Sequence, residues 1–509
     1  MTGGDVMGLL GRQKIYTDVE KIDKNNVVDV LQKAYAKHRQ NVLDIQYLID
    51  YERGEQPLKR QKTVRADIDI KVNSSLPNYI KKFKKGYNWG NPILLVQRGN
   101  KEIHNTNPDM DDSGISGLNE ILKNGENIAF KDQQMAEFIE ICGIGHRMIE
   151  PKTFPAIINE IPESLVNIYT LDSRFTFVVY HNGPGQKEMM GVSYVKRSGK
   201  NYFTCFTNTE RFEIEAGEIK NHSSNILGEI PIVEYERSVD RTGCFERKIK
   251  EIDALNILES DFANDVSQRT QEMWWGDNID FKEDDNGEPL KPKSGDWILT
   301  YSSDGKVAKI APLSSTFDGT STLNAIGRLR TTILQDCYVP IQYESSGGGS
   351  TGTATDMSSG WSAAELDALQ EQQMTERGKR KELSLILKAI KTVPTRALPE
   401  NSPIRMVHNS DCDFHFSRRR NYDLINKANF LVQLANIGVS GQHLFKQSEI
   451  FPDPVQAWMD SKDMFEAIQK SKISETSSSD TRISSDGSDQ TGNSPILDGI
   501  NTSNSKQVI

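Results

Sequence analysis

The spacing of apolar residues alternates between helical and strand-like periods along the chain. From residue 27 up to Gly54 and Pro57, apolar side chains recur mostly every three or four residues, which predicts an amphipathic helix. A strand-like stretch, DIDIKV, follows, and then a helix that begins near Ser75 and Pro77 and an apolar strand at ILLV. The first hundred residues therefore mix helices with short strands.

Residues 100 to 235 carry the pattern of an α+β region. Two helices are predicted in LNEILKNGENIAFKDQQMAEFIEICGIG, the second ending at the glycines. Four strand-like stretches come next: YTLDSRFTFVVYH, EMMGVSYVKR, KNYFTCFTN and RFEIEAG. The turn signals NGPG and RSGKN predict hairpins between them.

The longest helical stripe lies between residues 245 and 271. Its apolar positions follow one another at steps of four, three, three, three, four and four: Phe245, Ile249, Ile252, Leu255, Leu258, Phe262 and Val266. Short strands with Gly and Pro turns then interrupt the helical period, and a second helix carries Leu323, Ile326, Leu329 and Ile333. The helix at 245–271 can pack on its own domain or on an identical neighbour in a ring.

The C-terminal third is mainly helical. Ser362 with Glu365 predicts a capping box at the start of a long helix, which Gly378 is expected to bend. Alternating Cys412, Phe414 and Phe416 predict a strand. Three helices follow, and from about Ile473 the chain has few apolar residues, so we expect disorder there.

Length and composition point to roughly two to four domains or to a subunit built for an assembly, rather than to one compact core. The chain has 509 residues with 36% hydrophobic and 26% charged content, which predicts thin apolar layers completed by other domains or copies. The net charge of −10 argues against a protein that grips a phosphate backbone. We interpret the lysines of the helix after Ser75 as a solvated face rather than as a DNA site: Lys81, Lys82, Lys84 and Lys85.

Candidate chemistry is sparse. Five scattered cysteines without a C-x-x-C pair predict reduced thiols, and no histidine spacing predicts a metal site, so His146 near Cys142 is interpreted as packing. An active site is not predicted, because no pair of carboxylates, no Ser-His-Asp order and no metal-ligand cluster stands out in the sequence. There is also no apolar stretch of roughly 18 residues and no signal-peptide pattern, so we expect a soluble protein.

A glycine-rich run, YESSGGGSTGTATDMSSGW, tests the idea of a nucleotide site. Gly347 and Gly352 have the G-x-x-x-x-G spacing of a P-loop, but Thr353 and Ala354 stand where Lys and Ser or Thr are needed. We therefore interpret the run as a flexible tether or as a loop beside which something large slides.

Several segments, in order, resemble the portal proteins of long-tailed double-stranded DNA bacteriophages. The match is carried by YERGEQ with KVNSSLPNYIKKFKKGYNWGNPILL, by LGEIPIVEYERS with FERKIKEIDALNILESDFANDV, by SGGGSTGTATDMSSGWSAAELDA, and by LANIGVSGQHLFKQSEIFPDP. The residues at the positions of the family's long-helix motif are Asp253, Asn256, Ser260, Asn264 and Asp265.

This resemblance implies an α+β portal fold that assembles as a ring of twelve. It implies the following regions: N-terminal arm 1–26, wing 27–244, first stem helix 245–271, clip 272–317, second stem helix 318–340, channel loop 341–361, crossing helix 362–393, wing return strand 394–420, crown helices 421–472 and a disordered tail 473–509. The eleven stripe residues named above would pack the stem helices. Polar residues such as Asn256, Glu259, Asn264 and Gln268 would face outward or toward the channel.

The resemblance also implies a function at one capsid vertex of the virion, after assembly in the bacterial cytoplasm. The ring would be the channel for DNA packaging and ejection, without enzymatic activity or cofactor, and would bind the terminase large subunit, a head–tail adaptor, and major capsid and scaffolding proteins. Its channel loop would face DNA through Ser345, Ser346, Gly347, Gly348, Gly349, Ser350, Thr351, Gly352 and Thr353. Trp274, Trp275 and Trp297 would contact partners or pack the clip. The alternatives are another head–tail adaptor or structural protein and an ATP-dependent DNA motor.

Overall fold

The computed structural model forms two compact units, Met1–Asp423 and Leu424–Ile509, and each is described by itself. The structure describes the following residues: 11–58, 68–98, 113–152, 157–158, 161–162, 164–270, 274–277, 307, 309–312, 319–341, 360–418, 423–448, 450–451, 457–458, 460–465 and 467. The predicted disordered tail and the glycine-rich run at 342–359 lie outside these ranges.

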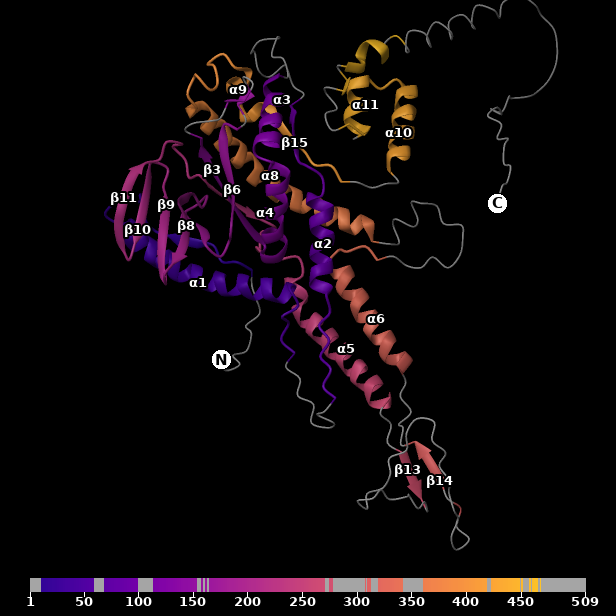
Figure 1. Ribbon diagram of the computed structural model, residues 1–509. Coiled ribbons are helices and arrows are strands. Elements are labelled where there is room, and N and C mark those ends of the chain that lie inside the picture. The colour runs from indigo at the N-terminus through magenta and orange to yellow at the C-terminus, as the bar shows by residue number, and fades with distance from the viewer. Residues whose placement is uncertain are drawn as a thin grey trace, which may run out of the picture. The chain divides into compact units, whose positions relative to one another are not determined.

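A six-stranded sheet with one helix across it forms one layer of the first unit. In spatial order its strands are β1 (Ile15–Thr17), β7 (Thr176–His181), β8 (Glu188–Arg197), β9 (Lys200–Phe206), β10 (Glu210–Glu215) and β11 (Glu218–Ser224). β1 runs parallel to β7, and all other pairs are antiparallel. Helix α1 (Val27–Glu52) lies along the sheet (Figure 1), and its Val30, Leu31 and Ala34 share a buried core with strand residues such as Val179.

A three-stranded sheet organises the second and largest core. Its strands are β12 (Ile232–Glu236), β3 (Ile144–Pro151) and β6 (Val166–Leu171), in the order β12-β3-β6. Helices α4 (Ile128–Cys142) and α8 (Trp361–Thr392) contribute buried residues to the same core. Smaller elements complete it: α3 (Ser113–Glu120), the π-helix η1 (Ile121–Gly125), α9 (Pro403–Met406), and the two-stranded sheet of β2 (Leu94–Gln97) and β15 (Cys412–His415).

Two long helices, α5 (Ile249–Thr270) and α6 (Gly319–Asp336), lie side by side and lead away from this body (Figure 1). A 3-10 turn at Glu246–Lys248 precedes α5. Residues of α1 and of α2 (Leu76–Trp89) pack around the start of α5 and the end of α6. Beyond the pair, β13 (Trp274–Asp277) and β14 (Lys309–Pro312) form an antiparallel ladder.

The described residues of the second unit include the helices α10 (Asp423–Ile437) and α11 (Gly441–Ser448) and helical residues at 460–465. An aromatic cluster holds it together, in which Phe445 stacks on Phe451 with ring centroids 5.0 Å apart. Trp458 and Phe465 add edge contacts to the cluster. The short β4–β5 hairpin, Ile157–Ile158 with Ile161–Pro162, belongs to the first unit.

The fold is the mixed helix-and-sheet fold that the periodicity predicts, with three departures. β3 was not predicted because two of its residues, His146 and Arg147, are polar and yet fully buried. Residues 68–72, the described part of DIDIKV, join no sheet, and side chains of α5 bind the backbone N–H groups of Ile70 and Val72 instead. The exposed strand β11 has few apolar residues and so carries no alternating signal.

The start of α8 differs from the predicted capping box. The helix begins at Trp361, and its N-cap is Gly360, which takes the left-handed conformation with φ of 85° and makes no side-chain cap. With Gly360 as the N-cap, Glu365 is the fifth residue of the helix and not the third, as a capping box requires. Its carboxylate instead accepts hydrogen bonds from Tyr87 Oη at 2.5 Å and Arg418 Nη1 at 2.6 Å. The 32-residue helix continues through Gly378, and the bend expected there stays a prediction. An added Cβ there would lie 2.4 Å from ring atoms of Tyr235, so this glycine allows α8 to cross β12 closely.

Candidate functional site

The α5–α6 pair is where the predicted packing residues fall, and its base is buried within the chain. Five of the eleven residues lie in one core with α1 and α2: Phe245, Ile249, Ile252, Leu255 and Ile333. Ile326 and Leu329 are partly buried against that core, and Leu258 and Phe262 are also partly exposed. The base of the pair therefore packs on its own subunit.

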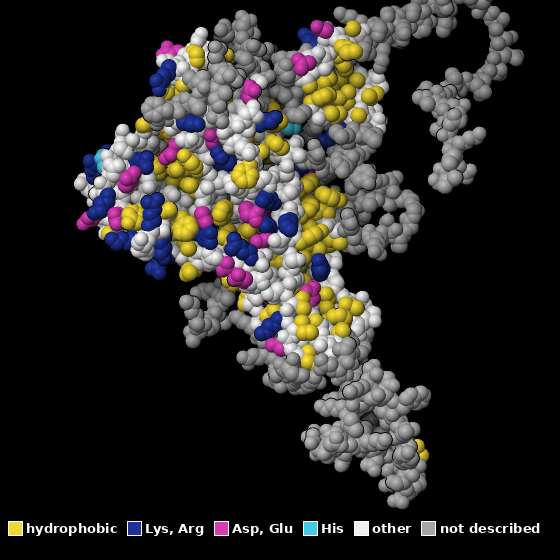
Figure 2. Space-filling view, in the orientation of Figure 1, with side chains coloured by type: hydrophobic (Ala, Val, Ile, Leu, Met, Phe, Trp, Pro, Cys, Tyr) yellow, Lys and Arg dark blue, Asp and Glu magenta, His cyan; other side chains and the backbone are white. Residues whose placement is uncertain are grey.

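Farther along the pair, apolar side chains face solvent. Val266 of α5 is 45% exposed and Leu323 of α6 is 52% exposed. Ile257, which is 38% exposed, lies on the opposite side of α5, nearer the face that carries Asn264. Figure 2 shows hydrophobic side chains gathered over this part of the molecule. Two packed helices bury only the sides that face each other. Exposed apolar side chains on their outer sides are typical of a surface that binds another protein chain.

One side of α5 carries a ladder of polar side chains that binds the segment 68–74. The ladder consists of three hydrogen bonds from backbone N–H groups to side-chain oxygens: Ser74 to Asn256 Oδ1 at 2.8 Å, Val72 to Ser260 Oγ at 2.9 Å and Ile70 to Asn264 Oδ1 at 2.8 Å. Asn264 Nδ2 also donates to Ile70 O at 3.0 Å. These side chains satisfy a stretch of backbone that has no strand partner.

The geometry of the ladder explains the four-residue spacing of Asn256, Ser260 and Asn264. Four helical residues rise about 6.0 Å, and two extended residues advance about 6.6 Å. Every fourth side chain on the helix therefore meets every second amide of an extended segment. All three side chains are 1% exposed. The expectation that Asn256 and Asn264 face outward or toward a channel is wrong. Both side chains are buried and form hydrogen bonds with the backbone of segment 68–74.

Of the other two polar residues named for that face, Glu259 is partly buried, and burial raises the pKa of its carboxyl. The side chain of Gln268 lies outside the described part of the structure.

Basic residues of α2 hold the neighbouring helices rather than facing solvent. Lys84 Nζ lies 2.6 Å from Asp367 Oδ2 of α8, and Lys81 Nζ lies 2.9 Å from Glu52 Oε1 of α1. Both lysines are buried, whereas Lys82 is exposed. The interpretation of these lysines as a solvated face is therefore wrong for Lys81 and Lys84. Both are buried beside carboxylates of other helices, and those helices are distant in the sequence.

The first turns of α8 depend on such charged contacts. Arg237, which follows β12, reaches Asp367 at 3.2 Å, Glu371 at 3.5 Å and Glu140 of α4 at 3.1 Å. Burial, together with the nearby Glu371 carboxylate, raises the pKa of Glu140 well above its ordinary value. On the outer side of these turns Leu366 is 58% exposed and faces solvent. The start of α8 is thus anchored by ion pairs and leaves apolar surface open.

The second half of α8 is fixed by a buried ion network. Arg147 of β3 lies 2.7 Å from Asp132 and 2.9 Å from Glu382, and Lys379 lies 2.7 Å from Asp132. Tyr235 donates a hydrogen bond to Glu382. Burial by itself raises the pKa of Glu382, but the charges of Arg147 and Lys379 outweigh it and hold the pKa at about 2.

The α5 helix starts from a tightly packed joint. Arg12 Nη2 contacts Glu246 Oε1 at 2.5 Å, and both side chains are buried. The second carboxylate oxygen of Glu246 accepts a hydrogen bond from Gly243 N at 2.8 Å. An added Cβ at Gly243 would lie 2.0 Å from the carbonyl oxygen of Ile141, so the backbone there has no room for a side chain. This joint sets the direction in which α5 leaves the body.

The described residues contain no group of three or more His, Cys, Asp or Glu side chains placed to hold a metal ion. All five cysteines are free and buried. His146 is buried in a polar network, with Nδ1 3.0 Å from Ser173 Oγ and Nε2 3.1 Å from Glu234 Oε2. No helix in the described ranges is long and apolar enough to cross a membrane.

Other predicted site residues cannot be placed. The channel-loop residues 345–353 and Trp297 lie outside the described residues. The backbone of Trp274 and Trp275 belongs to β13, opposite Pro312 and Ala311 of β14, and nothing is described of the two side chains. Sequence reasoning missed the ladder on α5, although the four-residue repeat of Asn256, Ser260 and Asn264 was a signal that could have found it.

Fold and surface together define a structural subunit, in which a projecting helix pair carries apolar side chains that this chain leaves uncovered. Residues 20–476 match the family described as "Phage portal protein, SPP1 Gp6-like". The chain therefore belongs to this portal protein family, as its sequence motifs predicted. The family is a structural one.

Among curated proteins none matches the chain. One similar solved structure is titled "Neck of empty GTA particle computed with C6 symmetry". It has 12% sequence identity and a TM-score of 0.40, and the match covers 78% of this chain and 96% of that chain.

Proposed function

We propose that copies of this chain assemble into a twelve-membered ring at one vertex of a phage capsid, and that viral DNA passes through the ring during packaging and ejection. Membership of the portal protein family supports the role. The single observation that carries the ring is the exposed apolar surface on the α5–α6 pair, at Val266 and Leu323. Apolar side chains on the outside of a projecting helix pair are removed from water only when another subunit packs against them.

In this proposal the helix pair has two functional sides. The ladder side is closed by the chain's own segment 68–74, which leaves the apolar side for the next subunit. The pair then forms part of the channel wall. The small module with β13 and β14, at the far end of the pair, is proposed to contact the terminase large subunit during packaging and a head–tail adaptor later.

The chain itself is proposed to hydrolyse no nucleotide, and a separate motor drives the DNA. The glycine-rich run between α6 and α8 in the sequence is proposed as the loop that faces DNA, because small and weakly polar residues give many backbone conformations and no charged grip. A net charge of −10 suits a channel that must not hold DNA tightly. The ring is proposed to sit in the virion, with major capsid and scaffolding proteins as its other contacts.

Electron microscopy of the purified chain, with its mass in solution, tests the ring. Wild type is expected to show rings with a central hole and a mass near twelve subunits. Leu323→Glu and Val266→Glu should shift the chain to smaller species, because each places a charge on the proposed subunit contact. Val195→Glu is the matched control, since Val195 is 53% exposed on the six-stranded sheet. A wild-type chain that stays monomeric at high concentration would refute the ring.

The loop is tested separately by deletion of residues 347–353. Rings should still form, and DNA packaging into capsids should fall. If the deletion abolishes ring assembly instead, the run is a structural joint and not a sliding contact.

A further inference from the structure

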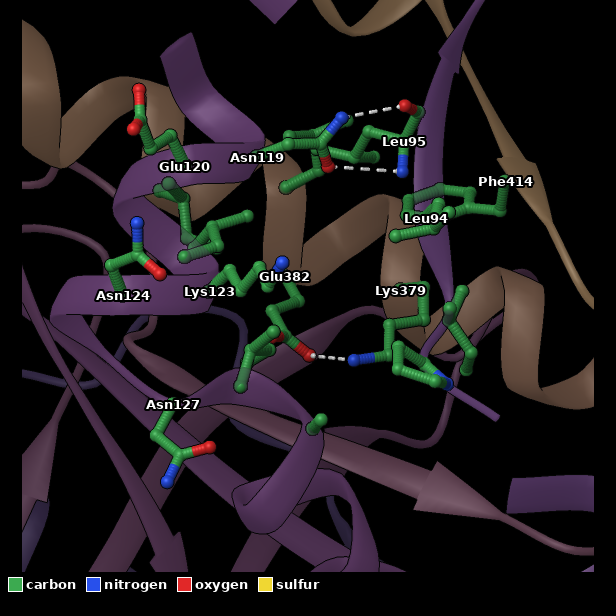
Figure 3. A pocket seen from close by; sticks show the side chains of 17 residues that line it. Leu94, Leu95, Asn119, Glu120, Lys123, Asn124, Asn127, Lys379, Glu382 and Phe414 are labelled. Carbon is green, nitrogen blue, oxygen red and sulfur yellow. Dashed lines mark hydrogen bonds and ion pairs between the residues drawn. The ribbon is translucent and has the colours of Figure 1, made fainter. Parts of the chain in front are cut away.

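A half-open pocket lies between β2, the π-helix η1 and the second half of α8. Its volume is about 870 Å³, within the range of roughly 300–1,000 Å³ that is usual for ligand sites in proteins. The walls are largely apolar and include Ile93, Leu94, Leu122, Leu383 and Phe414. Figure 3 shows the pocket with asparagine side chains around it. The proposed ring makes no use of this pocket.

The charged residues in the pocket are already neutralised. Lys379 contacts Asp132 at 2.7 Å and Glu382 at 3.4 Å, and Glu382 also contacts Arg147 at 2.9 Å. These partners leave no net charge for a phosphate, a carboxylate or an ammonium group. Glu120 and Lys123, which also line the pocket and are exposed, carry opposite charges, so together they add no net charge. The pocket therefore favours an uncharged ligand.

Amide groups supply the polar part of the pocket, as a peptide backbone requires. Asn119 already shows the pairing: its Nδ2 donates to Leu95 O at 2.8 Å, and its Oδ1 accepts from Leu95 N at 3.2 Å (Figure 3). This side chain thus binds the edge of β2 as a neighbouring strand would. Asn124 and Asn127 line the same pocket and are exposed. Each offers a donor and an acceptor to a further stretch of backbone.

The backbone around the mouth is unusual for a helix hairpin. Residues 121–125 form a π-helix, an irregularity that is common at functional sites. Asn127 follows in the left-handed conformation with φ of 48°, which is rare for residues other than glycine. Together these place the exposed asparagines at the mouth.

A second cavity of about 200 Å³ adjoins the first, because Pro92, Ile93 and Ala129 line both. Trp89 lines this smaller cavity and is 3% exposed. Its indole N–H is buried and has no hydrogen-bond partner in the described structure. A buried donor without a partner is costly, and a carbonyl oxygen of a ligand would satisfy it.

We propose that this double pocket binds an extended, uncharged segment of a partner polypeptide, with apolar side chains in the large cavity and a backbone carbonyl on the Trp89 indole N–H. Apolar walls match the side chains, and the asparagine amides match the backbone. Nucleic acid and anionic lipid do not fit, because the pocket offers no net positive charge. The site is independent of ring formation, so either proposal can fail alone.

Isothermal titration of the full chain with the capped tripeptide acetyl-Leu-Phe-Leu-amide tests the site, with the Ser-Gly-Ser analogue as the probe control. The apolar peptide should bind and the analogue should not. Trp89→Phe should weaken binding by roughly 2- to 10-fold, the range for one hydrogen bond. Because Trp89 is packed in the core, this variant should also melt at a lower temperature, so its affinity is measured where circular dichroism shows it fully folded. Trp361→Phe, in the aromatic group with Phe83 and Tyr87, is the matched control and should leave binding unchanged.

Ala129→Phe provides the second variant, since its ring would fill the junction of the two cavities. Loss of peptide binding with an unchanged melting temperature supports the proposal. Absence of binding to wild type at millimolar peptide, or equal binding by Ala129→Phe, overturns it. If the peptide is silent and Ala129→Phe instead changes the oligomeric state, the occupant is a second copy of this chain and the proposal is wrong.

Discussion

Gly378 provides the sharpest test of how α8 crosses β12. A Cβ added at this position would lie 2.4 Å from two ring atoms of Tyr235 and 3.0 Å from a third. Ordinary carbon contacts are about 3.5–4.0 Å, so Gly378→Ala requires the ring to move by about 1 Å. The ring is 1% exposed, and its hydroxyl is bound to Glu382, so it has little freedom to move.

The expected magnitude follows from two opposing effects. Overpacking in a buried site costs about 1–3 kcal/mol, and the rigid ring and its bound hydroxyl put this case near the upper end. Replacing a helical glycine by alanine returns about 1 kcal/mol of helix propensity. We therefore expect Gly378→Ala to lower the free energy of unfolding by about 2 kcal/mol.

Urea unfolding, followed by circular dichroism at matched oligomeric state, measures this change. Gly327→Ala in α6 is the control, because its added Cβ would meet no heavy atom within 4 Å. That variant should gain up to about 1 kcal/mol, so the same substitution acts with opposite signs at the two positions. In a Tyr235→Leu background the penalty of Gly378→Ala should largely disappear. Unchanged or increased stability of Gly378→Ala in the wild-type background would refute the close-crossing explanation.

Three further predictions concern the polar contacts. Asn264→Ala should cost about 1–3 kcal/mol and speed amide hydrogen exchange in segment 68–74, whereas Asn324→Ala, exposed on α6, should do neither. Lys84→Met should lower stability by about 1–3 kcal/mol, because it removes the shorter of the two ion pairs of Asp367 and leaves only the contact with Arg237 at 3.2 Å; Lys82→Met, on the exposed face, should stay within about 0.5 kcal/mol. The folded-state pKa of Glu382, about 2, lies below its ordinary 4.5. The ionised Glu382 therefore contributes about 3 kcal/mol to the free energy of unfolding above pH 4.5, and this contribution is lost as the pH falls toward 2. Glu382→Gln should flatten the acid side of a curve of stability against pH. An unchanged acid side in the variant would contradict this.

The long elements could be predicted from the sequence because their apolar residues repeat locally. The stripe from Phe245 to Val266 predicts α5, and Leu323 to Ile333 predicts α6. The portal family could be predicted for a similar reason, since its motifs are local strings in a fixed order. A helical period depends only on residues within a few turns, and no distant partner is needed to see it.

The buried polar contacts were decided by the tertiary structure. In the sequence Lys84 cannot be told from a surface lysine, but in the structure it forms an ion pair with Asp367 of α8. Asn256 was expected to face outward or toward a channel, but its side chain accepts a hydrogen bond from the backbone N–H of Ser74. The sequence likewise gives no sign that Gly378 packs against the ring of Tyr235. In each case the partner is more than a hundred residues away, so local periodicity carries no trace of it. The sequence by itself therefore determined the long helices and the family, and the three-dimensional structure decided which polar side chains hold the elements together and which apolar ones remain for a partner.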